Sequence, residues 1–246
     1  MQRHIPVAIA VALGVAAGPA AGQQFLGRVG GGCTTLPANN QQQVSIDTTI
    51  PAAATVFVTV ATSSNFVSDL TIGDATGSHY QALGGTHGGS AGTLVHFRAI
   101  LQRPLNAGSA LNLSYGNAST AVQSCVSVLG YRGIPAGAIV QDALGAATGQ
   151  STTPAVTATA ASAAGQQFVL ASFATNANPG GVNTTPPATA LPAVCSADNS
   201  LCILDAWYAG DAIGTANVQL TIGSPANWSG ALTALYADGI FGNGFD

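Results

Sequence analysis

The amino-acid sequence predicts an all-β fold: an antiparallel two-sheet sandwich, jelly-roll or immunoglobulin-like, stabilised by disulfides. Apolar and polar side chains alternate with a period of two, most clearly over residues 111–115 and 218–222, which is typical of strands with one buried face. Short Gly-, Asn- and Asp-bearing turn signals recur between such segments, and this spacing favours a sandwich. Four cysteines lie beyond a segment with the pattern of an export signal.

Residues 1–22 have the pattern of a secretory signal peptide. A basic start at Arg3 precedes an apolar stretch over residues 5–17, and small residues at 20–22 complete the pattern. The alternative is a membrane anchor, but a proline and a glycine interrupt the stretch, and a spanning helix needs about 20 mostly apolar residues. We therefore expect cleavage before Gln23, no membrane span after cleavage, and a secreted or cell-surface protein, extracellular or periplasmic.

The strands are expected where β-branched or aromatic residues cluster between turn signals. Besides the two alternating segments, these runs are 55–62, 94–101, 122–131, 167–174, 202–209 and 228–237. The turn signals are 74–77, 84–85, 88–89, 106–108, 116–117 and 178–181. Residues 134–149 and 155–164 could be argued to be helical, but the alternation that starts at Val156 favours a strand.

The length after signal removal fits one sandwich domain, because all-β sandwiches run to about 200–250 residues as single units. We expect an N-terminal segment with the first strand over residues 23–50, the sandwich over 51–238, and a tail over 239–246. A division of the sandwich into two halves at 145–151 is the second reading, because that segment has the small-residue composition of a linker.

The cysteines are expected to form two disulfides, since an exported chain meets an oxidising compartment. Cys195 and Cys202 would close a small loop around an Asp-Asn turn, which leaves Cys33 to pair with Cys125. The alternative is a zinc site, but it would need ligands at paired short spacings such as C-x2-C, and the chain has none.

The composition excludes several function classes. All five basic residues are Arg and all nine acidic residues are Asp, and charged residues make up 6% of the chain, against about 25% in an ordinary soluble domain. The arginines are scattered rather than clustered, so the chain lacks the basic surface that nucleic-acid binding requires. No cofactor motif is present either, and we expect no cofactor.

Four residues form the sequence's best candidate for a ligand-binding face: Asp205, Trp207, Tyr208 and Asp211. An aromatic side chain beside carboxylates can hold a sugar, and two carboxylates about 5–9 Å apart are the groups that cleave glycosides. The alternative is that Trp207 belongs to the core, as large aromatics usually do.

A nucleophilic serine is a weaker candidate. Residues 88–92 match G-x-S-x-G around Ser90 and follow His87, but a nucleophile elbow needs a strand, a sharp turn and then a helix. Ser90 instead lies in a glycine-rich loop before an expected strand, so no catalytic residue is predicted.

A metal site is also a weak candidate. His79, His87 and His96 lie near Asp74 in the sequence, and imidazole and carboxylate ligands suit zinc or iron. Strand alternation, however, places Arg98 on the face of His96, where a cation would repel the metal. We predict no metal site.

The order of elements carries a resemblance. The features are Asp74-Ala-Thr-Gly-Ser-His-Tyr80; strands 95–101 and 110–115 joined by Asn106-Ala-Gly108; Leu129-Gly-Tyr-Arg-Gly133; and two Trp-containing strands, 206–208 and 227–230. Over residues 50–238 this order resembles a β-sandwich domain of secreted and surface-attached bacterial proteins. The resemblance implies a fold and a surface location, and no reaction.

The C-terminal segment 240–246 is similar to a short Phe- and Gly-bearing C-terminal signature of some secreted bacterial proteins. The alternative is that its two Phe side chains pack on the sandwich.

Taken together, the sequence leads us to expect a secreted, non-catalytic, adhesion-type protein that binds a glycan or another cell-surface component. A secreted hydrolase, either a glycosidase that uses Asp residues or an esterase that uses Ser90 with His87, is the alternative. A structural coat subunit is a third reading, because low charge does little to oppose self-association.

Overall fold

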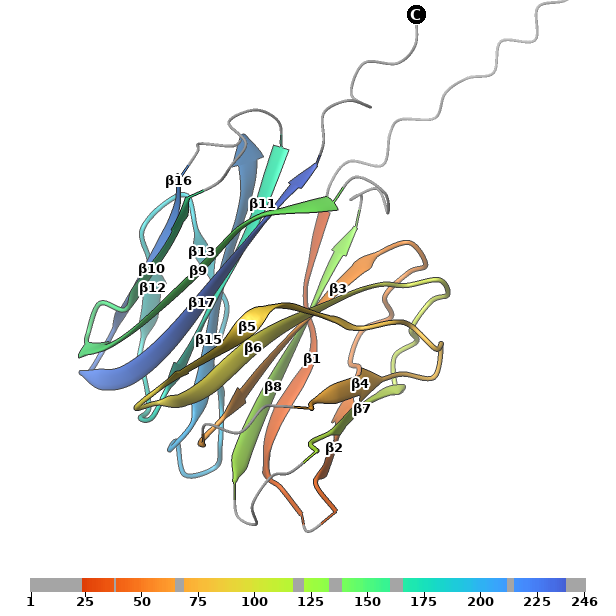
Figure 1. Ribbon diagram of the computed structural model, residues 1–246, viewed down its shortest axis with the longest axis horizontal. Helices are drawn as coiled ribbons and strands as arrows, with labels where there is room; N and C mark the ends of the chain where they lie inside the picture. Colours follow the sequence, from red (N-terminus) through yellow and green to blue (C-terminus); the bar gives the residue numbers. More distant parts are fainter. Residues whose placement is uncertain are drawn as a thin grey trace, which may run out of the picture.

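The computed structural model describes residues 24–37, 39–64, 69–116, 122–132, 139–159, 166–211 and 215–237. In this part of the chain every regular element is a β-strand. The strands are β1 (Gln24–Thr35), β2 (Gln41–Ser45), β3 (Thr55–Thr62), β4 (Thr71–Gly73), β5 (Gln81–Gly89), β6 (Gly92–Ile100), β7 (Ala110–Ser114), β8 (Gln123–Arg132), β9 (Ile139–Ser151), β10 (Ala155–Thr159), β11 (Gln166–Thr175), β12 (Val182–Thr184), β13 (Thr189–Ala190), β14 (Val194–Cys195), β15 (Cys202–Asp211), β16 (Thr215–Ile222) and β17 (Ala226–Ala237). The predicted all-β fold is confirmed (Figure 1).

The strands form four antiparallel sheets that pack as two sandwiches. In the first half of the chain, a large sheet of order β1-β8-β3-β6-β5 faces a small sheet of order β2-β7-β4. In the second half, a large sheet of order β9-β17-β11-β15-β13, with β14 also paired to β15, faces a small sheet of order β10-β16-β12. The antiparallel sandwich expected from the sequence is therefore present twice.

The two halves share one connectivity. The first, eighth, third and sixth strands of each half run side by side in the large sheet, and the second, seventh and fourth form the small one. This is jelly-roll connectivity, except that the fifth strand pairs with the sixth at the edge of the large sheet. The short strands β13 and β14 hold the fifth position in the second half.

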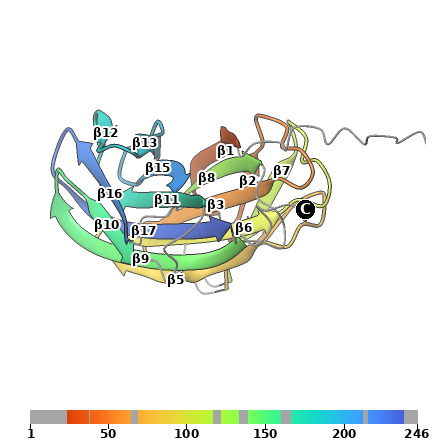
Figure 2. The same cartoon turned by 90° about the horizontal axis from the view of Figure 1, so that it is seen from above.

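The two large sheets pack face to face, and the small sheets lie outside them. Figure 2 shows β10 and β16 towards one end of the molecule and β2 and β7 towards the other. Two apolar clusters fill the space between the large sheets; one contains Phe57, Leu129 and Phe168, and the other contains Leu94 and Ile203. The large sheets are therefore covered on both faces.

This layering explains two kinds of strand sequence. All eight residues of β3 are buried, because its even-numbered residues face the small sheet while Phe57 and Thr59 face the other half. A strand buried on both faces reads as a nearly continuous apolar run. In the small sheets, β2 and β7 alternate between buried and exposed residues, since only one face of these sheets is covered.

Both predicted disulfides are confirmed. Cys33 on β1 is bonded to Cys125 on β8, and Cys195 on β14 is bonded to Cys202 on β15. Each bridge joins residues directly opposite each other on neighbouring antiparallel strands.

Several local expectations require correction. The glycine pairs at 84–85 and 88–89 were expected to be turns, but they lie within β5, whose register with β6 shifts between Leu83 and His87. A shift of this kind lets a strand continue through glycines with unusual backbone angles. Residues 145–151 are not a linker, because they form the end of β9 and pair with β17.

The remaining domain expectations are placed as follows. We expected one sandwich over 51–238, and the strands of that range belong to two sandwiches, with β1 and β2 completing the first. The expected signal peptide (1–22) and tail (239–246) lie outside the described residues. Within the described ranges no helix is long and apolar enough to cross a membrane.

Candidate functional site

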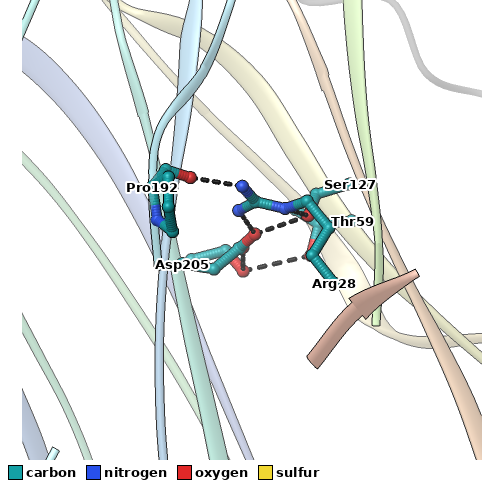
Figure 3. Close-up of polar contacts among 6 residues, drawn as sticks. Arg28, Thr59, Ser127, Pro192 and Asp205 are labelled. Carbon is teal, nitrogen blue, oxygen red and sulfur yellow. Dashed lines mark hydrogen bonds and ion pairs between the residues drawn. The ribbon is translucent and has the colours of Figure 1, made fainter. Parts of the chain in front are cut away.

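Asp205, predicted as a ligand residue, lies at the centre of the interface between the two large sheets. It belongs to β15, and its side chain is completely buried. Its Oδ2 accepts hydrogen bonds from Arg28 Nη2 at 2.8 Å and Ser127 Oγ at 2.6 Å, and its Oδ1 accepts one from Ser172 Oγ at 2.6 Å (Figure 3). The carboxylate therefore joins strands from both halves of the chain.

The hydrogen positions in this network follow from its geometry. Ser172 gives its only hydroxyl proton to Asp205, so Thr59 must be the donor in the 3.0 Å contact between Thr59 Oγ1 and Ser172 Oγ. Ser127 likewise donates to Asp205 and accepts from Arg28 Nε at 2.9 Å. The hydroxyl protons of Ser127 and Ser172 are therefore both donated to the Asp205 carboxylate.

The network is built to hold a buried charge. A buried carboxylate is costly unless it is paired and hydrogen bonded, and here one guanidinium and two hydroxyls satisfy it. Arg28 is 17% exposed and also donates to the carbonyl oxygen of Pro192 on the second half. We infer that the hydrogen bonds and ion pair of Asp205 stabilise the interface between the two sandwiches.

Trp207 and Tyr208 of the predicted ligand face do not join Asp205 on an exposed surface. Trp207 is half-buried on the same side of β15, and its ring stacks on Phe25 of β1 with ring centroids 4.1 Å apart. Tyr208 points the opposite way, into the core of the second sandwich. Asp211 is the last residue of β15. The strand's alternation thus separates Tyr208 from the other three positions.

The buried Tyr208 hydroxyl makes no hydrogen bond to the described residues. The buried amide of Gln167, from the neighbouring strand β11, is in the same situation. Burial raises the pKa of Tyr208, so the hydroxyl is a neutral donor in an apolar core.

Asp74, predicted to begin a turn, closes that turn with its own side chain. Its Oδ1 accepts from the backbone and hydroxyl of Thr76 and from the backbone of Ser78, and its Oδ2 accepts from the Tyr80 hydroxyl at 2.8 Å. Partial burial alone raises the pKa of Asp74, but these hydrogen bonds outweigh it and hold the pKa below its usual value. For Tyr80, burial and then the bond to Asp74 raise the pKa of the phenol.

Ser90 does not lie on an elbow. It is exposed in the two-residue turn that joins β5 to β6, directly after the pair formed by Gly89 and Gly92. The turn leads into a strand rather than into the helix that a hydrolase elbow requires.

The three histidines are dispersed. His96 is buried, with its Nδ1 2.9 Å from the Thr233 hydroxyl of β17, whereas His79 is exposed after the Asp74 turn. His87 lies on β5, opposite Leu94. The described residues contain no group of three or more metal-ligating side chains.

An open groove that the sequence analysis did not predict lies beside the start of β5 and the end of β6. Its volume is about 310 Å³; residues 77–79 and Gln81 form one side, and residues 98–100 and Gln102 form the other. Arg98 is half-buried there, and its guanidinium has no hydrogen-bond or ion-pair partner among the described residues. The sequence signal that could have indicated this site is an arginine within an expected strand, in a chain that has only five arginines.

A second hollow is larger but chemically plainer. It has a volume of about 460 Å³ and lies between β12 and the segment 190–193. The described residues that line it are glycine and aliphatic residues, so none of their side chains offers a charge or a hydrogen bond. The groove at Arg98 combines an open cavity with several polar residues and a guanidinium that has no partner among the described residues, and it is our candidate site.

Comparisons with known proteins found no counterpart. No protein-family model matches the chain, and no curated protein or solved structure matches it. The class of protein defined by the fold is a tandem pair of jelly-roll sandwiches with an open polar groove on the first.

Proposed function

We propose that this is an exported, non-catalytic recognition protein of the adhesion type, which binds a glycan or another cell-surface component. The observation that carries the proposal is the groove beside β5 and β6. The exposed residues His79, Gln81 and Gln102 line it together with Arg98. Imidazole, amide and guanidinium groups are donors suited to sugar hydroxyls and acidic substituents.

Export is supported by the disulfides. Two bridges engage all four cysteines, and disulfides persist in oxidising compartments outside the cytosol. The signal-like pattern over residues 1–22 agrees with this location.

The absence of catalysis is proposed because the candidate reacting groups have structural roles. Asp205 is buried and saturated by three donors, Asp74 is engaged by its own turn, and Ser90 forms a hairpin turn. A general acid or base must instead come within hydrogen-bond reach of a substrate atom.

A glycan array tests the proposal, with the chain from Gln23 onwards as the probe. We expect saturable binding that falls at least tenfold in the double variant Gln81→Ala/Gln102→Ala. The matched control is Gln24→Ala/Gln150→Ala, which removes two exposed amides outside the groove and leaves binding unchanged.

Two results would contradict the proposal. Absence of binding to every glycan and to isolated cell-surface material would remove the recognition role. Turnover of glycosides or esters that is lost in Asp205→Asn or Ser90→Ala, with folding intact, would establish the hydrolase instead.

A further inference from the structure

We propose that the groove at Arg98 recognises a carboxylate group on an acidic glycan, such as a chain of uronic acids. The inference rests on the proposed function and names the chemical class of its ligand. Arg98 lies near the end of β6, directly opposite Phe57 on β3 and Gln81 on β5. Neighbours on both sides therefore fix the backbone that carries the guanidinium.

The arginine is set apart by its environment. Arg28 is paired with Asp205, and Arg103 and Arg132 are exposed to water. Arg98 is instead half-buried without a partner among the described residues, and this burial lowers its pKa. A desolvated, unpaired charge is costly, so an anion that enters the groove gains from pairing with it.

The described walls of the groove do not neutralise this charge. None of the described residues that line it is acidic. The acidic residue nearest in sequence is Asp74, whose oxygens accept hydrogen bonds from Thr76, Ser78 and Tyr80 and are held in their own turn. In a protein with a formal net charge of -4, the groove is a local cationic site.

The chemistry of the lining selects a carboxylate on a sugar. A guanidinium presents two parallel N–H donors that match the two oxygens of a carboxylate. Gln81, Gln102 and His79 line the same groove as Arg98, and their amide and imidazole groups can bond sugar hydroxyls. The groove is open to solvent, as the binding of one residue of a longer polymer requires.

Calorimetric titration with a uronic-acid oligosaccharide and with its carboxyl-reduced neutral counterpart tests the inference. We expect the acidic form to bind at least tenfold more tightly, and Arg98→Gln to abolish that preference. Arg98→Lys keeps the charge but loses the paired donors, so we expect an intermediate affinity. Arg103→Gln, a nearby exposed arginine, is the control and changes affinity less than twofold. Unfolding midpoints verify that each variant is folded.

The outcomes separate the inference from the proposed function. Equal binding of acidic and neutral forms, unaffected by Arg98→Gln, would overturn the carboxylate assignment while a glycan-binding function stands. No binding of either form, or of any glycan, would overturn both. Acetate or inorganic phosphate that binds as tightly as the oligosaccharide would overturn the glycan as the source of the anion.

Discussion

Thr59 and Ser172 hold corresponding positions in the two halves of the chain, and their hydroxyl oxygens lie 3.0 Å apart across the interface. β3 and β11 are the third strands of their halves, and each ends in a threonine three residues further on, Thr62 or Thr175. Both of these threonines donate to the carbonyl oxygen two residues ahead, at 2.9 and 3.1 Å. The two strands therefore align residue by residue.

Corresponding residues can touch only near the axis that relates their halves. The interface is thus arranged like that of a two-fold dimer, in which one patch meets its own equivalent. His96 lies opposite Thr59, and Asp205 lies opposite Ser172. Each of these neighbours reaches across the interface, His96 to Thr233 and Asp205 to Ser127. The two halves differ in the residue at this position, because the first half supplies the imidazole of His96 and the second supplies the carboxylate of Asp205.

The order of the hydroxyl bonds predicts unequal costs for two substitutions. Thr59→Val removes one neutral hydrogen bond and should lower the free energy of unfolding by about 1 kcal/mol. Ser172→Ala removes a donor from the buried Asp205 carboxylate and should cost about 2–3 kcal/mol, as bonds to charged groups do. Urea unfolding measures both. Thr157→Val, which removes an exposed bond to Asn217, is the control and should stay within about 0.5 kcal/mol. An equal or reversed order would contradict the assigned donors.

The sequence predicted the fold class and disulfides because these depend on local patterns. The strand expected at 55–62 coincides with β3, and the pairing of Cys195 with Cys202 follows from a short loop. The division into two sandwiches was harder to place, because the small-residue segment 145–151 that suggests it is the end of β9. The two halves are related by connectivity and by scattered matches such as Val58-Thr59-Val60-Ala61-Thr62 with Ala171-Ser172-Phe173-Ala174-Thr175, which stand out only once the strands are aligned.

The candidate site was less predictable than the fold. Asp205 was singled out for its aromatic neighbours, but its environment depends on Arg28, 177 residues earlier in the sequence. No local pattern reports such a contact. For Arg98 the sequence indicates only a cation on the same strand face as His96, because the lack of a partner for a guanidinium is a property of the folded chain.

Two glycines at corresponding positions predict a shared packing requirement. Gly30 pairs with Val128 beside Val58, and Gly145 pairs with Leu232 beside Ala171. A Cβ at Gly30 would lie 2.5 Å from the carbonyl oxygen of Ser45, and one at Gly145 would meet that of Thr157. In each half, the backbone of the first strand (β1 or β9) therefore packs closely against the backbone of the second strand (β2 or β10).

We expect Gly30→Ala and Gly145→Ala each to lower the free energy of unfolding by about 2–3 kcal/mol, in the range of overpacked cores. The control is Gly73→Ala in β4, where a Cβ would meet nothing within 4 Å, and it should stay within about 0.5 kcal/mol. Guanidinium unfolding measures all three variants. A mild effect at Gly145 alone would show that β9 and β10 can separate.

Two buried tyrosines should respond differently to loss of the hydroxyl. Tyr115 is hydrogen bonded to Gln42 at 2.8 Å and to Ser124 at 2.6 Å, and burial raises its pKa to about 12. Tyr208 has no such bond among the described residues. Tyr115→Phe should cost about 1–2 kcal/mol because it leaves buried partners unpaired, whereas Tyr208→Phe should be neutral or stabilising. A loss of more than about 1 kcal/mol on Tyr208→Phe would show a bound water or ligand at the hydroxyl.

The Asp74 turn predicts a pH-dependent contribution to stability. Its pKa in the folded protein lies below the usual value, so the contribution is fully present above the unfolded-state pKa and is lost as pH falls through the folded-state pKa. Asp74→Asn should lower the free energy of unfolding at pH 7 by about 0.5–1 kcal/mol, because water partly screens this half-buried carboxylate. Between pH 5 and pH 2 the difference in unfolding free energy between the variant and the wild type should shrink.

Asp198, whose pKa is lowered by hydrogen bonds from Ser196, Ser200 and Gln123, contributes equally to both proteins and cancels. Asp47→Asn, at an exposed position without a side-chain hydrogen bond in the described part of the chain, is the matched control for the removal of one carboxylate. Urea unfolding at several pH values measures the effect, and a difference that grows towards pH 2 would mean that the turn stabilises the protonated carboxyl instead.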